Sequence, residues 1–197
     1  MTNDRLFEEP DGATPIGGVD ARGLRQNHIL TRAELNAAEQ DNILAGLTWT
    51  RRLRRPDYLT EAFVLRLHKE MFGAVWRWAG HLRTHETNLG VVPHLIRPRL
   101  RAALDDVRYW VDQKSYGIDE TALRLHHILV SVHPFPNGNG RHTRLMADLL
   151  VQQLGAPPFS WGGDDIGTMG ELRSRYIASL KAADAHDIGP LLAFGRS

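Results

Sequence analysis

The chain has 197 residues, enough for one domain with an apolar core, and its formal charge of +1 lacks the basic excess typical of nucleic-acid-binding proteins. Because it contains no cysteine, a disulfide framework, a thiolate zinc site and a cysteine nucleophile are excluded. No segment resembles a signal peptide or reaches the roughly 18 consecutive apolar residues of a membrane helix, so we expect a soluble cytoplasmic protein with no membrane partner.

The N-terminal 30 residues are rich in glycine, proline and aspartate and have little periodicity, which predicts an irregular arm over 1–30 ahead of a domain spanning 31–197. Thr31 followed by Glu34 forms a capping box, which predicts a helix running to about Arg54. The arginines at the end of this helix favour a solvated face beside the negative end of the helix dipole over a nucleic-acid patch.

A second helix is predicted from Thr60 to about Gly73, and the two tryptophans that follow it, Trp76 and Trp78, are expected in the core. Residues 87–92 then have the pattern of a short β-hairpin, with Asn88 to Gly90 near its turn. Further helices are expected over roughly 98–114, 119–132, 139–154 and 168–184, the last opened by a capping box of Thr168 and Glu171, with a short one after Asp187. The predicted fold is mainly α with one small β element.

The segment 133–144 reads His-Pro-Phe-Pro-Asn-Gly-Asn-Gly-Arg-His-Thr-Arg and lies between two amphipathic helices, the second of which it opens. Gly138 and Gly140 permit a backbone whose successive amides form an anion nest, and the helix start adds partial positive charge. Arg141 and Arg144 bring two guanidinium groups to the same end, where they suit phosphate oxygens. These features predict a cradle for a pyrophosphate or triphosphate.

Two further side chains of this segment have chemistry that suits phosphate transfer. His133 is the group in the segment that can accept a proton near neutral pH. Asn137 offers a carbonyl oxygen to a magnesium ion bound to the phosphates. Each residue also has a structural interpretation: a common turn, arginines paired with Asp148, or a histidine that ends a helix. The coincidence of base, nest and two arginines within twelve residues favours the functional one.

These residues resemble the signature of the Fic family (filamentation induced by cAMP), which runs His-x-Phe-x-acidic-Gly-Asn-Gly-Arg-x-x-Arg. The positions that match are His133, Phe135, Gly138, Asn139, Gly140, Arg141 and Arg144. One position departs from the pattern, since Asn137 stands where the family most often has an acidic residue. The similarity extends over roughly 58–194 and implies a Fic-type helical bundle with a small β-hairpin flap.

The resemblance implies a protein adenylyltransferase that moves AMP from ATP, with Mg²⁺, to a serine, threonine or tyrosine hydroxyl of a target protein. It assigns His133 as the general base and Asn137 to the metal. It assigns Gly138, Asn139 and Gly140 to the anion hole, Arg141 to the β- and γ-phosphates, and Arg144 to the γ-phosphate. The flap would dock the target's main chain like an added strand through Thr87, Asn88, Leu89, Gly90 and Val91.

The N-terminal part, with Asn27-His28-Ile29 and the helix from Thr31, is similar to the subgroup called mobile mystery protein B. Members of that subgroup are typically paired with a helix-turn-helix protein, which implies a possible regulatory partner; a toxin-like role is implied only by family analogy. Many family members are restrained by a helix with the pattern Ser/Thr-x-x-x-Glu-Gly/Asn. No glutamate of this chain has that pattern, so we expect no inhibitory helix of the usual kind.

Three other functions remain open from the sequence. Proteins of this fold also transfer UMP, phosphoryl or phosphocholine groups, and an intact Gly140 and Arg141 favour AMP by analogy only. A metal-dependent hydrolase would use histidines among positions 126, 127, 133 and 142, but no carboxylate completes a familiar ligand spacing. A third possibility is a catalytically weak nucleotide-binding interaction module, favoured by Asn137 and by the arginines at 51–55.

Overall fold

A computed structural model describes residues 21–26, 28–29, 31–54, 56–163 and 169–197. Most of the expected arm, Arg55 and the cap residue Thr168 lie outside the described residues. Within the described ranges the chain folds into α2 (Arg32–Thr50), α3 (Glu61–Phe72), α4 (Pro93–Gln113), α5 (Ile118–Val132), α6 (Asn139–Gln153), α7 (Met169–Asp184) and α8 (Gly189–Arg196). The expectation of a mainly helical fold is confirmed.

Both N-terminal helices begin where their caps predict. The Thr31 hydroxyl accepts the Glu34 N–H at 3.2 Å and the Glu34 carboxylate accepts the Thr31 N–H at 2.9 Å, so the capping box is complete. At α3, the Thr60 hydroxyl accepts the Phe63 N–H at 3.2 Å. Helix α2 ends at Thr50, earlier than predicted, because the chain tightens there into a turn. The arginines that follow therefore lie beyond the helix.

Helix α4 begins at Pro93, five residues before the predicted start near residue 98. Proline suits the first turn of a helix, where its missing N–H would have had no partner. Ile96 in that turn is fully buried and ties it to the core. Pro98 lies inside the helix, where it removes one hydrogen bond without ending it.

The expected hairpin is not confirmed, since residues 81–92 contain no strand. The β pairing in the described part of the chain is a single isolated bridge between Leu24 and Trp76. Instead of a ladder between two strands, the Arg83 guanidinium donates to the carbonyls of His85 and Val91 within the segment. The Arg83 side chain thus donates to backbone carbonyls that would otherwise have accepted from a paired strand. Residues 81–92 form a folded loop, which is called the flap loop below.

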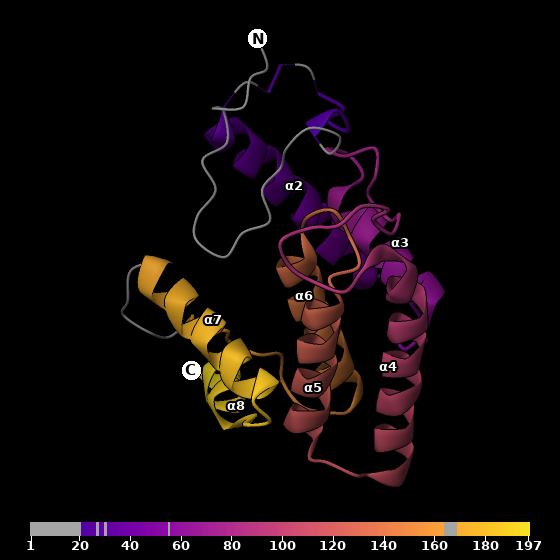
Figure 1. The fold of residues 1–197 in the computed structure, drawn as a ribbon, viewed down its shortest axis with the longest axis vertical. Helices are drawn as coiled ribbons and strands as arrows, with labels where there is room; N and C mark the ends of the chain where they lie inside the picture. Colours follow the sequence, from indigo (N-terminus) through magenta and orange to yellow (C-terminus); the bar gives the residue numbers. More distant parts are fainter. Residues whose placement is uncertain (1–20, 27, 30, 55, 164–168) are drawn as a thin grey trace.

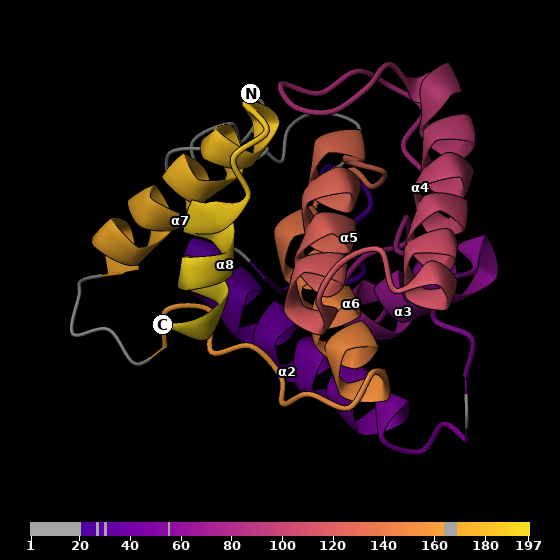
Figure 2. The same cartoon turned by 90° about the horizontal axis from the view of Figure 1, so that it is seen from below.

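Helices α5 and α6 pack side by side at the centre of the bundle (Figure 1). Helix α4 packs on α5, α3 on α6, and α2 on α3. Seen from below, α7 and α8 lie on one side of the α5–α6 pair and α4 on the other (Figure 2). The core lies between these layers and holds the largest fully buried side chains, among them Trp76, Phe72, Phe135, Leu125, Leu129 and Met146.

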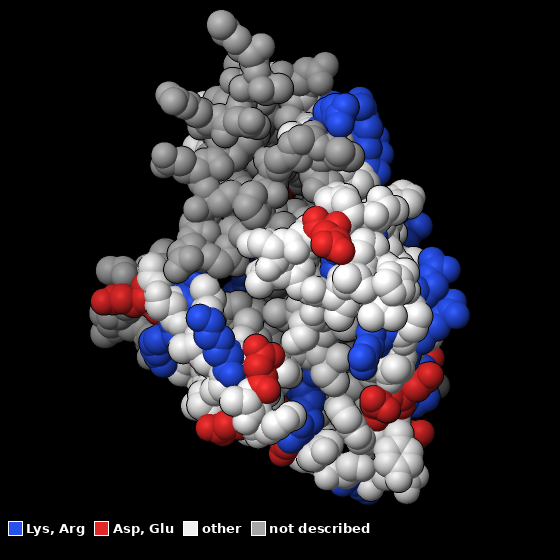
Figure 3. Space-filling model, viewed as in Figure 1, with Lys and Arg blue, Asp and Glu red and all other residues white. Residues whose placement is uncertain are grey.

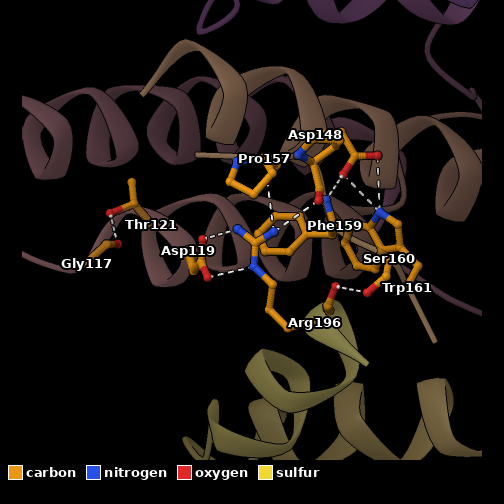
Figure 4. Close-up of polar contacts among 11 residues, drawn as sticks. Gly117, Asp119, Thr121, Asp148, Pro157, Phe159, Ser160, Trp161 and Arg196 are labelled. Atoms are coloured by element: carbon orange, nitrogen blue, oxygen red, sulfur yellow. Dashed lines mark hydrogen bonds and ion pairs between the residues drawn. The ribbon is translucent and has the colours of Figure 1, made fainter. Parts of the chain in front are cut away.

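The C-terminal end is fastened to the central pair by polar contacts (Figure 4). Arg196 at the end of α8 donates to both Asp119 carboxylate oxygens and lies over the Phe159 ring. Asp148 of α6 accepts the Phe159 N–H at 3.0 Å and the Trp161 Nε1–H at 3.0 Å. Asp148 is thus engaged with the segment after α6. No helix in the described part of the chain is long and apolar enough to cross a membrane.

Candidate active site

His133 stands at the junction between α5 and the following loop. It is the C-cap residue of α5 in a left-handed conformation, with φ 53° and ψ 61°, and its N–H donates to the Leu129 carbonyl. Few non-glycine residues adopt this region, although histidine is enriched there, and the conformation costs on the order of 1–3 kcal/mol. The chain therefore turns sharply at His133.

Arg83 ties the flap loop to this turn. It is 3% exposed, its Nε donates to the His133 carbonyl at 2.7 Å, and its backbone N–H donates to the Pro134 carbonyl at 2.9 Å. The Val91 N–H adds a bond of 3.3 Å to the Val132 carbonyl. Because these bonds join residues about 40 to 50 positions apart, the flap loop and the end of α5 form one unit.

Gly90 passes directly over the His133 side chain. Its φ is +96°, and a Cβ added to it would lie 2.4 Å from the His133 Cβ and 3.0 Å from the Val132 carbonyl oxygen. Real Cβ atoms do not approach other atoms so closely, and an L side chain would also be strained at this φ. Glycine at this position therefore permits the contact between the flap loop and His133.

The surroundings of His133 keep its ring neutral. The residue is 6% exposed, and burial together with the nearby positive charge of Arg83 lowers the pKa of His133 from 6.5 to about 4. A neutral imidazole has a nitrogen lone pair that can accept a proton. His133 is thus in the protonation state that a general base needs at neutral pH.

The loop after His133 is closed by the side chain of Asn139. Its Oδ1 accepts the Phe135 N–H at 2.9 Å and its Nδ2 donates to the Phe135 carbonyl at 2.8 Å. Asn139 is 2% exposed, so these two bonds satisfy a buried amide. The Asn139 side chain therefore fixes the loop, and it is the main chain at this position that can face an anion.

Gly138 and Asn137 shape the approach to α6. Gly138, the N-cap residue, has φ +80°, and a Cβ there would lie 2.7 Å from the Phe72 ring. The Asn137 Oδ1 accepts the Gly138 N–H at 2.6 Å, so the Asn137 side chain is held against the backbone of the turn. At Gly140, in the first turn of α6, an added Cβ would meet the Tyr176 hydroxyl at 3.8 Å, an ordinary contact that leaves the helix start open.

A buried histidine, His68, holds the loop that follows His133. The Nε2–H of His68 donates to the Asn137 carbonyl at 3.0 Å, while its Nδ1 accepts the Gly80 N–H at 3.0 Å. The ring stacks on Phe135 with 3.6 Å between ring centroids. Burial, with the neighbouring His142 and the positive charge of Arg141, holds the pKa of His68 well below its ordinary value. His68 therefore joins α3, the turn before the flap loop and the candidate metal position.

The two arginines of α6 are held in different ways. Arg141 pairs with Glu39 of α2, with 2.6 Å between Nη1 and Oε2, and lies over the Phe72 ring at 5.0 Å. The Arg144 guanidinium lies over the Tyr176 ring at 5.5 Å, and its Nε donates to the Gly140 carbonyl at 3.3 Å. Burial holds the pKa of the Arg144 guanidinium below its ordinary value. Both cations flank the start of α6.

The histidines proposed for a metal site serve other contacts. The ring of His142 donates from Nε2 to the Val64 carbonyl at 3.0 Å, and His126 shares a hydrogen bond of 3.0 Å with the Tyr176 hydroxyl. His127 pairs with Asp184 at 2.8 Å. Among the described residues no group of three or more histidine, aspartate or glutamate side chains is arranged to hold a metal ion. The geometry gives the metal-dependent hydrolase no support.

The flap-loop residues predicted to dock a target are mostly accessible. Asn88, Leu89 and Gly90 are exposed, and Thr87 and Val91 are partly buried, with Leu89 45% exposed. Exposed apolar side chains continue into the start of α4 at Val92 and Leu95. Figure 3 shows mainly uncharged atoms over this part of the molecule and basic side chains along the neighbouring edge.

The fold therefore brings His133, the glycine loop and both arginines together at the start of α6, with the flap loop beside them. Sequence reasoning did not assign functions to Glu39, His68 or Tyr176. Arg83 likewise had no function assigned from the sequence. The contacts that these residues make leave no local pattern in the sequence, because each contact joins residues that lie far apart in the chain.

Residues 58–151 match the sequence model of the Fic/DOC family. The curated protein adenylyltransferase fic-1 of Caenorhabditis elegans is 32% identical over 135 residues, which cover 66% of this chain and 25% of the relative. The protein adenylyltransferase Fic of Drosophila mojavensis is 28% identical over 142 residues, which cover 70% of this chain and 27% of that relative. This chain thus spans about a quarter of the length of the curated relatives it matches.

Solved structures share the fold. A fragment of C. elegans Fic-1 has a TM-score of 0.60 and 26% identity, covering 88% of this chain and 54% of that chain. BepC from Bartonella tribocorum, solved with bound AMPPNP, has a TM-score of 0.69 and 16% identity, covering 90% of this chain and 96% of its own. This chain belongs to the Fic/DOC family, whose sequence model matches its residues 58–151.

Proposed function

We propose that this chain is a protein adenylyltransferase that moves AMP from ATP to a serine, threonine or tyrosine hydroxyl of a target protein. The observation that carries the proposal is the position of His133: a buried, neutral imidazole at a left-handed turn, one loop before a helix start flanked by two arginines. The curated relatives that share this region are named protein adenylyltransferases, which supports the same activity here.

In the proposed step, the target's hydroxyl oxygen attacks the α-phosphorus of ATP. The bond from the α-phosphorus to the bridging oxygen breaks, and pyrophosphate leaves. His133 accepts the hydroxyl proton, because its ring is neutral at physiological pH. The products are an AMP ester of the target and pyrophosphate, so atoms and charge balance. The bound AMPPNP of BepC, on the same fold, is consistent with ATP as the nucleotide.

The leaving pyrophosphate is proposed to lie at the start of α6. The main-chain amides of Asn139 and Gly140 stand at the positive end of the helix dipole and offer donors to the β-phosphate. The Gly138 N–H already donates to the Asn137 side chain, and Gly138 provides the left-handed turn that presents these amides. Arg141 would contact the β- and γ-phosphates and Arg144 the γ-phosphate. Charge that develops on the leaving group in the transition state is thereby stabilised by fixed donors.

Magnesium is the ion that the family resemblance implies. Mg²⁺ usually takes one or two protein ligands besides phosphates and water, so a single amide oxygen fits. Asn137 is the residue that would hold it, through its side-chain amide oxygen. When bound, the ion supplies positive charge that neutralises the triphosphate.

The target is proposed to dock on the flap loop. Within residues 87–91, Asn88, Leu89 and Gly90 are exposed and Gly90 lies against His133, so an extended segment could pair with the main chain there and present a hydroxyl. Such docking tolerates many sequences. A helix-turn-helix partner protein, implied by the resemblance to mobile mystery protein B, is proposed as a regulator.

The test is transfer of radiolabelled AMP to proteins of a cell lysate by the wild type and by His133→Ala. We expect labelled protein bands with the wild type and at least a hundredfold weaker labelling with the variant, the order of magnitude that a general base contributes. His94 is an exposed histidine at the start of α4, so His94→Ala is the matched control and should transfer label to protein as the wild type does. Equal labelling by His133→Ala would refute the assignment of the base.

A further inference from the structure

Glu39 is a buried carboxylate that the proposed transfer step does not use. It lies on α2, and its side chain is 3% exposed. Its Oε1 accepts the Trp76 Nε1–H at 2.7 Å, and its Oε2 accepts the Arg141 Nη1–H at 2.6 Å. A carboxylate this deeply buried requires a cation and hydrogen bonds to be stable, and here it has both.

We propose that Glu39 is a positioning residue that fixes the Arg141 guanidinium in the orientation needed to bind the β- and γ-phosphates of the nucleotide. The inference rests on the proposed function, because it concerns the same phosphate cradle. It adds to that function a residue from α2, 102 positions away in the sequence, which does not belong to the segment 133–144.

The carboxylate is itself held in one orientation. Trp76 is 1% exposed and stacks on Trp78 with 4.9 Å between ring centroids, so its Nε1–H is a fixed donor. That donor engages Oε1 of Glu39 and directs Oε2 toward Arg141. The position of the arginine is therefore determined by rigid aromatic packing and not by a mobile surface side chain.

A second contact holds the guanidinium plane. Arg141 lies 5.0 Å from the centre of the Phe72 ring, and the same ring fills the space beside Gly138. Arg141 is thus linked by packing to the glycine that begins the proposed anion nest. Because Phe72 packs against both Arg141 and Gly138, it keeps the distance between the guanidinium and the proposed anion nest constant.

The pair leaves Arg141 able to bind phosphate. A guanidinium has five N–H donors, and the described contact with Glu39 uses one of its nitrogens. The Arg141 side chain is 35% exposed, whereas Glu39 faces the core. A preorganised arginine loses less side-chain entropy when a phosphate binds. This favours the interpretation that Glu39 positions Arg141 over the interpretation that it neutralises the charge of Arg141.

The test measures nucleotide affinity in Glu39→Gln. Glutamine keeps the size of the side chain and an oxygen that can accept from Trp76, but it removes the charge that orients Arg141. We expect the Kd of ATP and of ADP to rise about tenfold, the loss expected for one weakened charge-assisted contact, while the Kd of AMP changes less than about twofold. AMP lacks the phosphates that Arg141 is proposed to bind.

Asp41→Asn is the matched control, because it removes the same charge from an exposed position of the same helix. A second arm repeats the measurement with Arg141→Ala and with the double variant. If Glu39 acts through Arg141, Glu39→Gln should cause no further loss of ATP affinity once Arg141 is absent. Should Glu39→Gln fail to fold, Trp76→Phe removes the donor that orients the carboxylate and should weaken ATP binding without weakening AMP binding.

Each of the following results would overturn the inference. Unchanged ATP affinity in Glu39→Gln would show that the carboxylate does not act on the phosphate cradle. Tighter ATP binding or faster transfer in this variant would show that the Glu39–Arg141 pair inhibits the wild type. An equal loss for AMP and ATP would indicate a structural role only. A wild-type chain that binds no ATP would refute the proposed function as well, whereas wild-type transfer with an unaffected variant would refute the positioning role alone.

Discussion

At the scale of single residues, the site depends on a histidine whose surroundings determine its charge. His133 caps α5 in a left-handed conformation, where Arg83 binds its carbonyl and Gly90 covers its side chain. Burial and the Arg83 charge both disfavour the imidazolium form. The backbone turn and the protonation state of the base therefore have a common origin in the flap loop.

The lowered pKa of His133 predicts the pH dependence of transfer. A base with a pKa of about 4 stays neutral as the pH falls, so kcat/KM should change little between pH 7.5 and 5.5 on account of this group. A histidine with the ordinary value of 6.5 would be about nine-tenths protonated at pH 5.5, and the rate would fall about tenfold. A pH–rate profile with a midpoint near 6.5 would contradict the lowered pKa.

Asn137 predicts a dependence on magnesium. A neutral amide binds Mg²⁺ less tightly than a carboxylate, so Asn137→Asp should reach half-maximal turnover at a lower magnesium concentration than the wild type. Turnover measured against magnesium for both chains checks this, with Asn36→Asp at an exposed position of α2 as the control for added charge. Superimposable curves for the wild type and Asn137→Asp would remove Asn137 from the metal site.

At the scale of elements, the flap loop is a functional unit that depends on one glycine. Gly90→Ala places a methyl group against His133 and Val132, so we expect the loop to lift and kcat/KM to fall at least tenfold. The strain amounts to about 1–3 kcal/mol. Gly117→Ala is the matched control, since nothing lies within 4 Å of its added Cβ, and it should retain activity. Retained activity in Gly90→Ala would mean that the contact is not needed.

The helices could be predicted because their signals are local. Thr31 with Glu34, and Thr60, fixed the starts of α2 and α3, and apolar periodicity located α5 and α6 within one or two residues. The conformation of the flap loop could not be predicted, because its backbone bonds to a distant helix end and to the side chain of Arg83 instead of forming a ladder between two strands.

The candidate site likewise has a part that could be predicted from the sequence and a part that could not. Its loop and arginines lie in one continuous segment, 133–144, so their types and spacing predicted a phosphate cradle. Glu39 and His68 come from other helices and reach this segment only through the fold. A buried glutamate on α2 has no local pattern that distinguishes it from an exposed one, and packing alone reveals its partner.

At the scale of the whole molecule, four histidines are buried: His68, His126, His133 and His142. The pKa of each is lowered mainly by burial, to about 3 for His126 and about 4 for His133 and His142. The unfolded chain, with ordinary values near 6.5, therefore binds more protons than the folded chain between pH 6.5 and 4.

This difference predicts acid unfolding. The free energy of unfolding should fall as the pH drops below 6.5, by up to about 1.4 kcal/mol per pH unit for each of these histidines. Asp148 acts in the opposite direction, because burial raises its pKa to about 6 and its folded form takes up a proton earlier. Urea unfolding at pH 7.5, 6.0 and 5.0 checks the balance, and a stability that rises toward pH 5 would contradict it.

The proposed function requires that the phosphate cradle directs attack to the α-phosphorus of ATP. The most direct measurement uses ATP labelled at either the α- or the γ-phosphate, incubated with the chain and a cell lysate, with His133→Ala beside it. We expect protein to acquire label from the α-labelled nucleotide alone, and the variant to lose it. Label transferred only from the γ position would contradict adenylyl transfer and identify phosphoryl transfer instead.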